Sequence, residues 1–290
     1  MRRLAILWLV SCAGALSGSF PLSAMGCNLS EPETGTVAAI IDGETLKLAD
    51  GRTVRLIGAK APMPPLGFRG EDLWPLVEEA KEALTRLAAG KEVELRYGGT
   101  RTDRHGYALA HVFVVDGVSR LWLQQEMVKA GLARVYSFPD NRACVGDLLA
   151  SEGDARGKGL GVWGSPVYRI ASAEDVDRLG RLTQTYQLVE GRVVSVGEGA
   201  GRVYLNFARD WKSDFTISVA RKDASAFQAE GIDLKALAGK RVRVRGWVIW
   251  RNGPMIEATH PEQIEILTDD QKADDARTRW PQEPGPDIAL

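Results

Sequence analysis

Short segments of alternating apolar and polar residues, separated by turns such as Asp42-Gly43 and Asp50-Gly51, dominate the first half of the chain. The alternation predicts β-strands, and the close spacing of the turns predicts a meander. We expect strands at 36–41, 45–48, 53–58, 93–97 and 107–115. Apolar residues near helical spacing predict helices at 74–89, 121–131 and 141–156.

A second set of strand-like segments follows a polar helical stretch. We expect strands at 187–196, 203–207, 215–220, 241–250, 255–258 and 264–267, with a helical insert at 224–238. In each half, short strands interrupted by one helix are typical of the oligonucleotide/oligosaccharide-binding (OB) barrel. We therefore predict a mainly β fold with helices (α+β) that contains two OB-like five-stranded barrels.

The 290 residues suit two modest domains and a tail. We predict a first barrel over 30–166, a helical linker over 167–183 and a second barrel over 184–267. Residues 268–290 carry several prolines and acidic residues but few apolar ones, which predicts disorder.

The first 26 residues have the pattern of a signal peptide: two arginines, a short apolar run and small residues at Ala24 and Gly26. The run is too short to span a bilayer. An alternative interpretation makes Cys12 a lipid-anchored residue, because Leu9–Cys12 resembles a lipoprotein cleavage motif. Both interpretations predict export, to the periplasm or the medium.

Removal of such a signal peptide leaves Cys27 and Cys144 as the remaining cysteines. Two cysteines in an oxidising compartment usually pair, so we expect a Cys27–Cys144 disulfide. The alternative is two buried free thiols.

The formal net charge is −1, so the overall composition does not require a nucleic-acid partner. The sequence carries no zinc-ligand spacing, phosphate-binding loop or nucleophile elbow, which leaves those routes to catalysis without support. Any polyanion partner must therefore be recognised by a local group of residues.

Four motifs in the first half carry a family resemblance. They are Ile41-Asp-Gly-Glu-Thr45, Val54-Arg-Leu-Ile-Gly58, Arg101-Thr-Asp-Arg-His-Gly106 and Gly159-Leu-Gly-Val-Trp163. In order and spacing, the chain resembles the staphylococcal nuclease (thermonuclease) family from about residue 36 to 163. The resemblance implies a first barrel of that type.

The same resemblance implies a Ca²⁺-dependent phosphodiesterase site, in which carboxylates bind the metal, a glutamate activates water and two arginines bind the phosphate. Asp42 and Glu44 stand at metal-binding positions, and Arg55 stands at the first arginine. Three family residues are replaced here: the positions of a calcium carboxylate, the catalytic glutamate and the second arginine hold Lys60, Met63 and Tyr107.

These replacements predict a catalytically weak or inactive protein that binds nucleic acid, another anionic polymer or an envelope protein. The alternatives are a Ca²⁺-dependent nuclease that uses Asp42, Glu44 and Arg55, and a protein-binding scaffold. Purely structural roles are the alternative for these residues: Asp42 and Glu44 would be turn residues, and Arg55 would form a structural ion pair.

In the second half, three arginines share one face of a predicted strand that ends in aromatic residues. The set is Arg241, Arg243, Arg245 and Trp247. A basic strand with aromatic residues can bind single-stranded nucleic acid on an OB barrel. The alternative is an ordinary strand face balanced by carboxylates such as Glu190 and Glu257.

Overall fold

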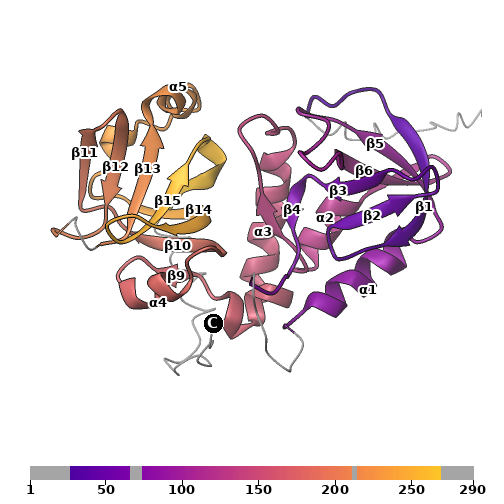
Figure 1. The fold of residues 1–290 in the computed structure, drawn as a ribbon, viewed down its shortest axis with the longest axis horizontal. Helices are drawn as coiled ribbons and strands as arrows, with labels where there is room; N and C mark the ends of the chain where they lie inside the picture. The colour runs from indigo at the N-terminus through magenta and orange to yellow at the C-terminus, as the bar shows by residue number, and fades with distance from the viewer. Residues whose placement is uncertain (1–26, 66–73, 211–213, 269–290) are drawn as a thin grey trace, which may run out of the picture.

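The computed structural model describes residues 27–65, 74–210 and 214–268. Two β-rich units lie side by side, and helix α3 (Val145–Gly157) lies between the first barrel and the second sheet (Figure 1). The expected signal peptide and all but the first residue of the expected tail lie outside the described residues.

Strands of the first unit are β1 (Glu33–Ile40), β2 (Thr45–Leu48), β3 (Thr53–Leu56), β4 (Gly58–Lys60), β5 (Glu92–Arg96), β6 (Ala108–Asp116), β7 (Ser119–Trp122) and β8 (Arg134–Tyr136). Its helices besides α3 are α1 (Val77–Ala88) and α2 (Leu123–Lys129), followed by the 3₁₀ turns η1 (Gly161–Gly164) and η2 (Pro166–Tyr168). The predicted strands are present, except that the one expected at 53–58 is divided into β3, which pairs with β2 and β6, and β4, which pairs with β8. The predicted helices are each a few residues shorter.

The first sheet has the order β3-β2-β1-β5-β6-β7, and a parallel pairing of β3 with β6 closes five of its strands into a barrel. The α1 helix follows the three-strand meander and precedes β5, as an OB barrel requires. The predicted fold class is thereby confirmed for this unit.

The second unit contains β9 (Ala171–Ser172), β10 (Tyr186–Arg192), β11 (Ser195–Gly199), β12 (Arg202–Asn206), β13 (Thr216–Ala220), β14 (Arg241–Trp250), β15 (Pro254–Ala258) and β16 (Ile264–Ile266). Its helices are α4 (Val176–Arg181) and α5 (Arg221–Ala229), with 3₁₀ turns η3 (Leu234–Leu237) and η4 (Pro261–Gln263). The sheet order is β11-β12-β13-β15-β14-β10-β9, and β16 pairs with β14. This sheet curls into a half-barrel of OB-like plan that has more than the five strands expected.

Two predicted elements of the second unit differ from the structure. The strand expected at 187–196 is divided into β10 and β11, because Val193 N–H donates to the Lys240 carbonyl while Val194 N–H donates to the Asn206 carbonyl. The chain thus passes from one ladder to another at this point. The expected helix at 224–238 ends at Ala229, and its last part is the 3₁₀ turn η3.

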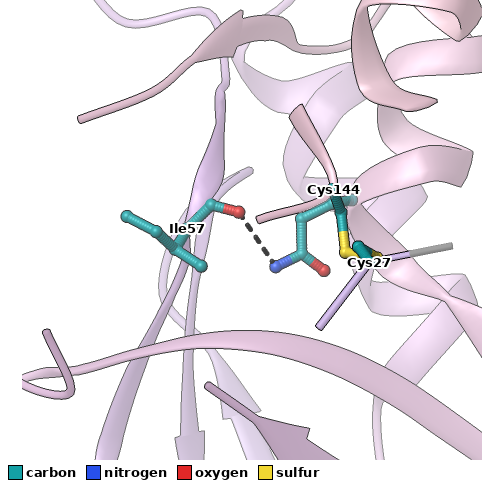
Figure 2. Close-up of a disulfide and its surroundings, with 4 residues drawn as sticks. Cys27, Ile57 and Cys144 are labelled. Atoms are coloured by element: carbon teal, nitrogen blue, oxygen red, sulfur yellow. Dashed lines mark hydrogen bonds between the residues drawn. A yellow bond between two sulfur atoms is a disulfide. The ribbon is translucent and has the colours of Figure 1, made fainter. Parts of the chain in front are cut away.

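A disulfide joins Cys27 to Cys144, as the cysteine count predicted, with the two Cα atoms 5.0 Å apart. Figure 2 shows this bridge together with Ile57, whose carbonyl accepts a hydrogen bond from Gln124 Nε2 at 3.2 Å. The bridge ties the start of the described chain to the first turn of α3, within the core of the first unit. None of the helices in the described ranges is long and apolar enough to cross a bilayer.

The two units share a small core of their own at their junction. Its buried members include Trp163 and Tyr168 from the first part of the chain, and Tyr186 and Leu188 from β10. The Tyr186 hydroxyl donates to the Val135 carbonyl at 2.6 Å, so β8 and β10 are directly linked. Burial of these apolar side chains favours a fixed arrangement of the two units.

Candidate nuclease-like site

The turn between β1 and β2 directs one carboxylate into the protein. Asp42 Oδ1 accepts a hydrogen bond from Glu44 N at 2.8 Å, the usual way an aspartate fixes a tight turn. A Cβ at Gly43 would lie 2.8 Å from both the Ala61 and Ala80 Cβ atoms, so only glycine fits between β4 and α1. The turn therefore buries Glu44, which is 4% exposed, and leaves Asp42 partly exposed.

Glu44 uses both of its carboxylate oxygens within the protein. Oε1 accepts from Lys60 Nζ at 2.8 Å, and Oε2 accepts from Ala61 N at 2.7 Å. The Lys60 side chain is 13% exposed, and its Nζ also lies 3.6 Å from Met63 Sδ. The structure thus brings together three of the residues singled out from the sequence.

Arg55 lies on β3 beside this turn, in register with Thr45 of β2. Its Nη1 lies 3.5 Å from Asp103 Oδ2, the long end of the hydrogen-bonding range, and its Cζ lies 5.6 Å from the centre of the Tyr107 ring. The Arg55 side chain is 40% exposed. Arg55 therefore makes a loose ion pair through Nη1 and is partly open to solvent, while its Nε is buried without a hydrogen-bond partner among the described residues.

Asp103 is held by its own loop. Burial alone would raise the pKa of this carboxyl, but hydrogen bonds from the backbone N–H groups of Tyr107 and His105, with the charge of Arg55, outweigh burial and lower the pKa. A carboxylate with a lowered pKa is a weak general base at neutral pH.

Tyr136 of β8 lies near these residues, because β8 pairs with β4 and sets Tyr136 opposite Gly58. Burial raises the pKa of its hydroxyl; the hydrogen bond from Trp247 Nε1 and the charge of Arg55 lower it, and the charge of Glu44 raises it. Tyr136 therefore lies within electrostatic reach of both Glu44 and Arg55. Sequence reasoning missed this residue, which belongs to none of the four motifs.

The basic strand predicted in the second unit lies at the junction instead of facing solvent. Arg243 and Arg245 are each 1% exposed. Arg243 Nε donates to Glu190 Oε1 at 2.7 Å, and Arg245 Nη2 donates to Glu152 Oε2 of α3 at 2.8 Å.

Glu265 of β16 joins the same network by pairing with Arg243 and Arg245. Burial would raise the pKa of Glu265, but these arginines and Arg156 lower it to about 2. Arg241 is more exposed and pairs with Glu190 at 3.4 Å. The arginines of this strand face are therefore balanced by carboxylates such as Glu190, as the alternative interpretation expected. Because Arg243 and Arg245 are buried, the strand does not present a basic face that is open to a ligand.

The comparisons with known proteins agree with the geometry of the first unit. Residues 53–165 match the model of the staphylococcal nuclease homologues. The chain is also 33% identical over 140 residues to Protein ParB of Escherichia coli, an alignment that spans 46% of this chain and 73% of that protein. The chain belongs to the family of staphylococcal nuclease homologues.

The residues present do not fit the calcium ion that this family relationship implies. Both Glu44 oxygens are engaged by Lys60 and Ala61, and an ammonium has no lone pair with which to coordinate a metal. In the described parts of the chain, no group of three or more His, Cys, Asp or Glu side chains is arranged to bind a metal.

Proposed function

We propose that this chain binds nucleic acid through its first barrel without calcium, and that it has lost the hydrolytic rate of a metal-dependent nuclease. The observation that carries the proposal is the Glu44–Lys60 ion pair, which is nearly buried. A tethered ammonium neutralises the carboxylate that would otherwise attract a cation. The loss concerns hydrolysis, while the barrel and Arg55 remain available for binding.

Neither Met63 nor Asp103 can take the place of the general base. Met63 offers a thioether, which does not accept a proton near neutral pH. Asp103 has a lowered pKa and is engaged by two backbone N–H groups. Loss of a positioned base typically reduces a rate by about 10² to 10⁴.

Binding would use the Arg55 side chain, which is 40% exposed, because a guanidinium can pair with a phosphate through two N–H groups. The neighbouring loop carries Arg104 and His105, both exposed, with Arg104 Nε 3.1 Å from His105 Nε2. The charge of Arg104 adds to the positive potential beside Arg55.

We also propose that the chain acts outside the cytoplasm, in the periplasm or the medium. The Cys27–Cys144 disulfide supports this location, because disulfides persist in oxidising compartments. The signal-like pattern of residues 1–26 points the same way.

The test combines hydrolysis and binding by the purified chain, with single-stranded DNA and RNA, in calcium or in chelator. We expect no calcium-dependent cleavage, and binding that weakens with salt as counterions are released. Arg55→Ala should weaken binding, whereas Arg86→Ala, which removes a 69%-exposed arginine on α1, should not.

Calcium-dependent cleavage that Arg55→Ala abolishes would overturn the proposal and favour a residual nuclease. Absence of both cleavage and salt-sensitive binding would overturn it in favour of a protein-binding scaffold. Either result is read directly from the same set of proteins.

A further inference from the structure

Four aromatic rings from both units meet at the junction, and we call them the junction aromatic cluster. The cluster consists of Tyr136, Phe138, Tyr186 and Trp247. The Tyr136 ring centre lies 4.6 Å from that of Phe138, 4.9 Å from that of Tyr186 and 6.5 Å from that of Trp247. These are ordinary distances for favourable ring contacts, so the four rings support one another.

The cluster borders the nuclease-like site. Tyr136 lies on β8, paired with the strand that carries Lys60, and its hydroxyl is within reach of the charges of Glu44 and Arg55. Trp247 of β14 reaches the same place from the second unit, because its Nε1 donates to the Tyr136 hydroxyl at 3.0 Å. The second unit thus contributes a side chain to the edge of a site formed by the first.

Trp247 is 43% exposed, while Tyr186 is buried and Tyr136 and Phe138 are partly buried. The hydrogen bond to Tyr136 uses the one donor of the indole, so its exposed surface offers a π face or edge rather than a polar group. The bond also fixes the ring, which reduces the entropy lost when a flat ligand stacks on it.

We propose that Trp247 stacks on a base of single-stranded nucleic acid whose phosphate is bound by Arg55. This inference rests on the proposed function and adds the ligand class and a residue from the second unit. A flat aromatic surface at the edge of a site that holds a partly exposed cation complements a base next to its phosphate. A duplex is a poorer occupant because its bases are already stacked on one another, and a polyanion without bases has nothing to place on the ring.

The experiment measures the affinity of the full, disulfide-bonded chain for two labelled probes of equal length, an oligothymidylate and an abasic oligonucleotide. Trp247→Leu should weaken binding of oligothymidylate by about 5- to 100-fold and leave binding of the abasic probe unchanged. The matched control is Trp250→Leu, on the same strand. Trp250 is 62% exposed and lies against α4, and its loss should affect neither probe.

Trp247→Phe is a second variant that controls for a folding defect, because it keeps an aromatic ring but loses the hydrogen bond to Tyr136. It should still bind oligothymidylate more tightly than the abasic probe. Equal binding of both probes by the unmodified chain, or an equal loss for both in Trp247→Leu, would overturn the inference. If Trp247→Leu changes nothing while Arg55→Ala still weakens binding, the inference fails and the proposed function stands. If the unmodified chain binds neither probe, both fail.

Discussion

Arg245 Nη2 lies 2.8 Å from Glu152 Oε2, and these two side chains, from different units, are 1% and 0% exposed. Burial removes the solvation of both charges, so each depends on its partner. The Arg245 Nη1 group also donates to the Val135 carbonyl at 3.3 Å. Arg245 also pairs with Glu265, and Glu152 also pairs with Arg156 at 3.5 Å and accepts a hydrogen bond from Val135 N at 2.7 Å. The junction is therefore held by a buried network of charges in which the Arg245–Glu152 pair joins the two units.

Arg245→Met should consequently destabilise the protein. The change leaves Glu152 without this buried partner, a loss of about 3–5 kcal/mol for a broken buried pair. The measurement is the free energy of unfolding from urea denaturation. Arg241→Met is the matched control on the same strand, where the side chain is 31% exposed and the expected cost is below about 1 kcal/mol. Equal losses in the two variants would contradict this account.

The disulfide predicts a second stability effect. It closes a loop with a sequence separation of 117 residues, and the chain-entropy model gives about 4–5 kcal/mol for a loop of that length. Cys27→Ser with Cys144→Ser should therefore lower the midpoint of unfolding in the oxidised state. Under reducing conditions, the unmodified chain should unfold like the double variant; a remaining difference would show that the serines themselves cause the loss.

How much the sequence could predict depends on the range of the interactions. The barrel of the first unit follows from local alternation and from turns such as Asp42-Gly43, which specify adjacent antiparallel strands. Spacing along β14 likewise showed that Arg243 and Arg245 share a face. It could not show what covers that face, because Glu152 lies 93 residues from Arg245.

The same distinction between local and long-range interactions applies to the candidate site. The family resemblance pointed to Glu44, Lys60 and Arg55. It could not show that Lys60 forms an ion pair with Glu44, because the direction of each side chain depends on the packing of β4 against the turn. The contact of Trp247 with Tyr136 joins residues 111 apart on different units, and no local pattern signals it.

Acid should destabilise the junction through His260. Its Nε2 and the Ser137 hydroxyl are hydrogen-bonded at 2.7 Å across the two units. Burial, followed by the charges of Arg142 and Arg245, lowers the pKa of His260 to about 4; Asp140 acts weakly in the other direction. In the unfolded chain, the pKa of the His260 imidazole is near 6.5. Between pH 6.5 and 4 this imidazole therefore binds a proton in the unfolded chain but not in the folded chain. Stability therefore falls as the pH drops from about 6.5 to about 4, by roughly 3 kcal/mol for this group.

His111 should contribute in the same window, because burial lowers its pKa to about 4 as well. The test is the unfolding free energy as a function of pH for the unmodified chain and for His260→Gln. The variant should lose about half of the pH dependence between 6.5 and 4. The carboxyl of Glu265, with a pKa of about 2, adds stability that is lost only below about 4.5, so the two contributions separate along the pH axis. An unchanged slope in His260→Gln would refute the assignment.

Removal of the Lys60 ammonium from the nuclease-like site should destabilise the protein, because the buried carboxylate of Glu44 loses its ion-pair partner. In Lys60→Met, Glu44 keeps only the hydrogen bond from Ala61 N, and we expect a loss of about 2–4 kcal/mol in the free energy of unfolding. Adding Glu44→Gln removes the charge and retains an acceptor for Ala61, so the double variant should recover much of the loss. Additive losses in the double variant would show that the pair is not coupled.

Lys60 stands where the family resemblance implies a metal ligand, and this predicts how the chain responds to calcium. A ligand that binds only the folded state increases the free energy of unfolding, by about 2.7 kcal/mol when the ligand concentration is a hundred times Kd. The unfolding temperature rises accordingly. We expect no such rise for the unmodified chain in millimolar calcium, because Lys60 engages Glu44. In Lys60→Asp, a carboxylate replaces the ammonium near Asp42 and Glu44, and calcium should raise the unfolding temperature. Lys60→Asn is the control, since it removes the ammonium without supplying the charge, and its response should be much smaller. A calcium-induced rise in the unmodified chain would show that the ion displaces Lys60 and that the site is still a metal site.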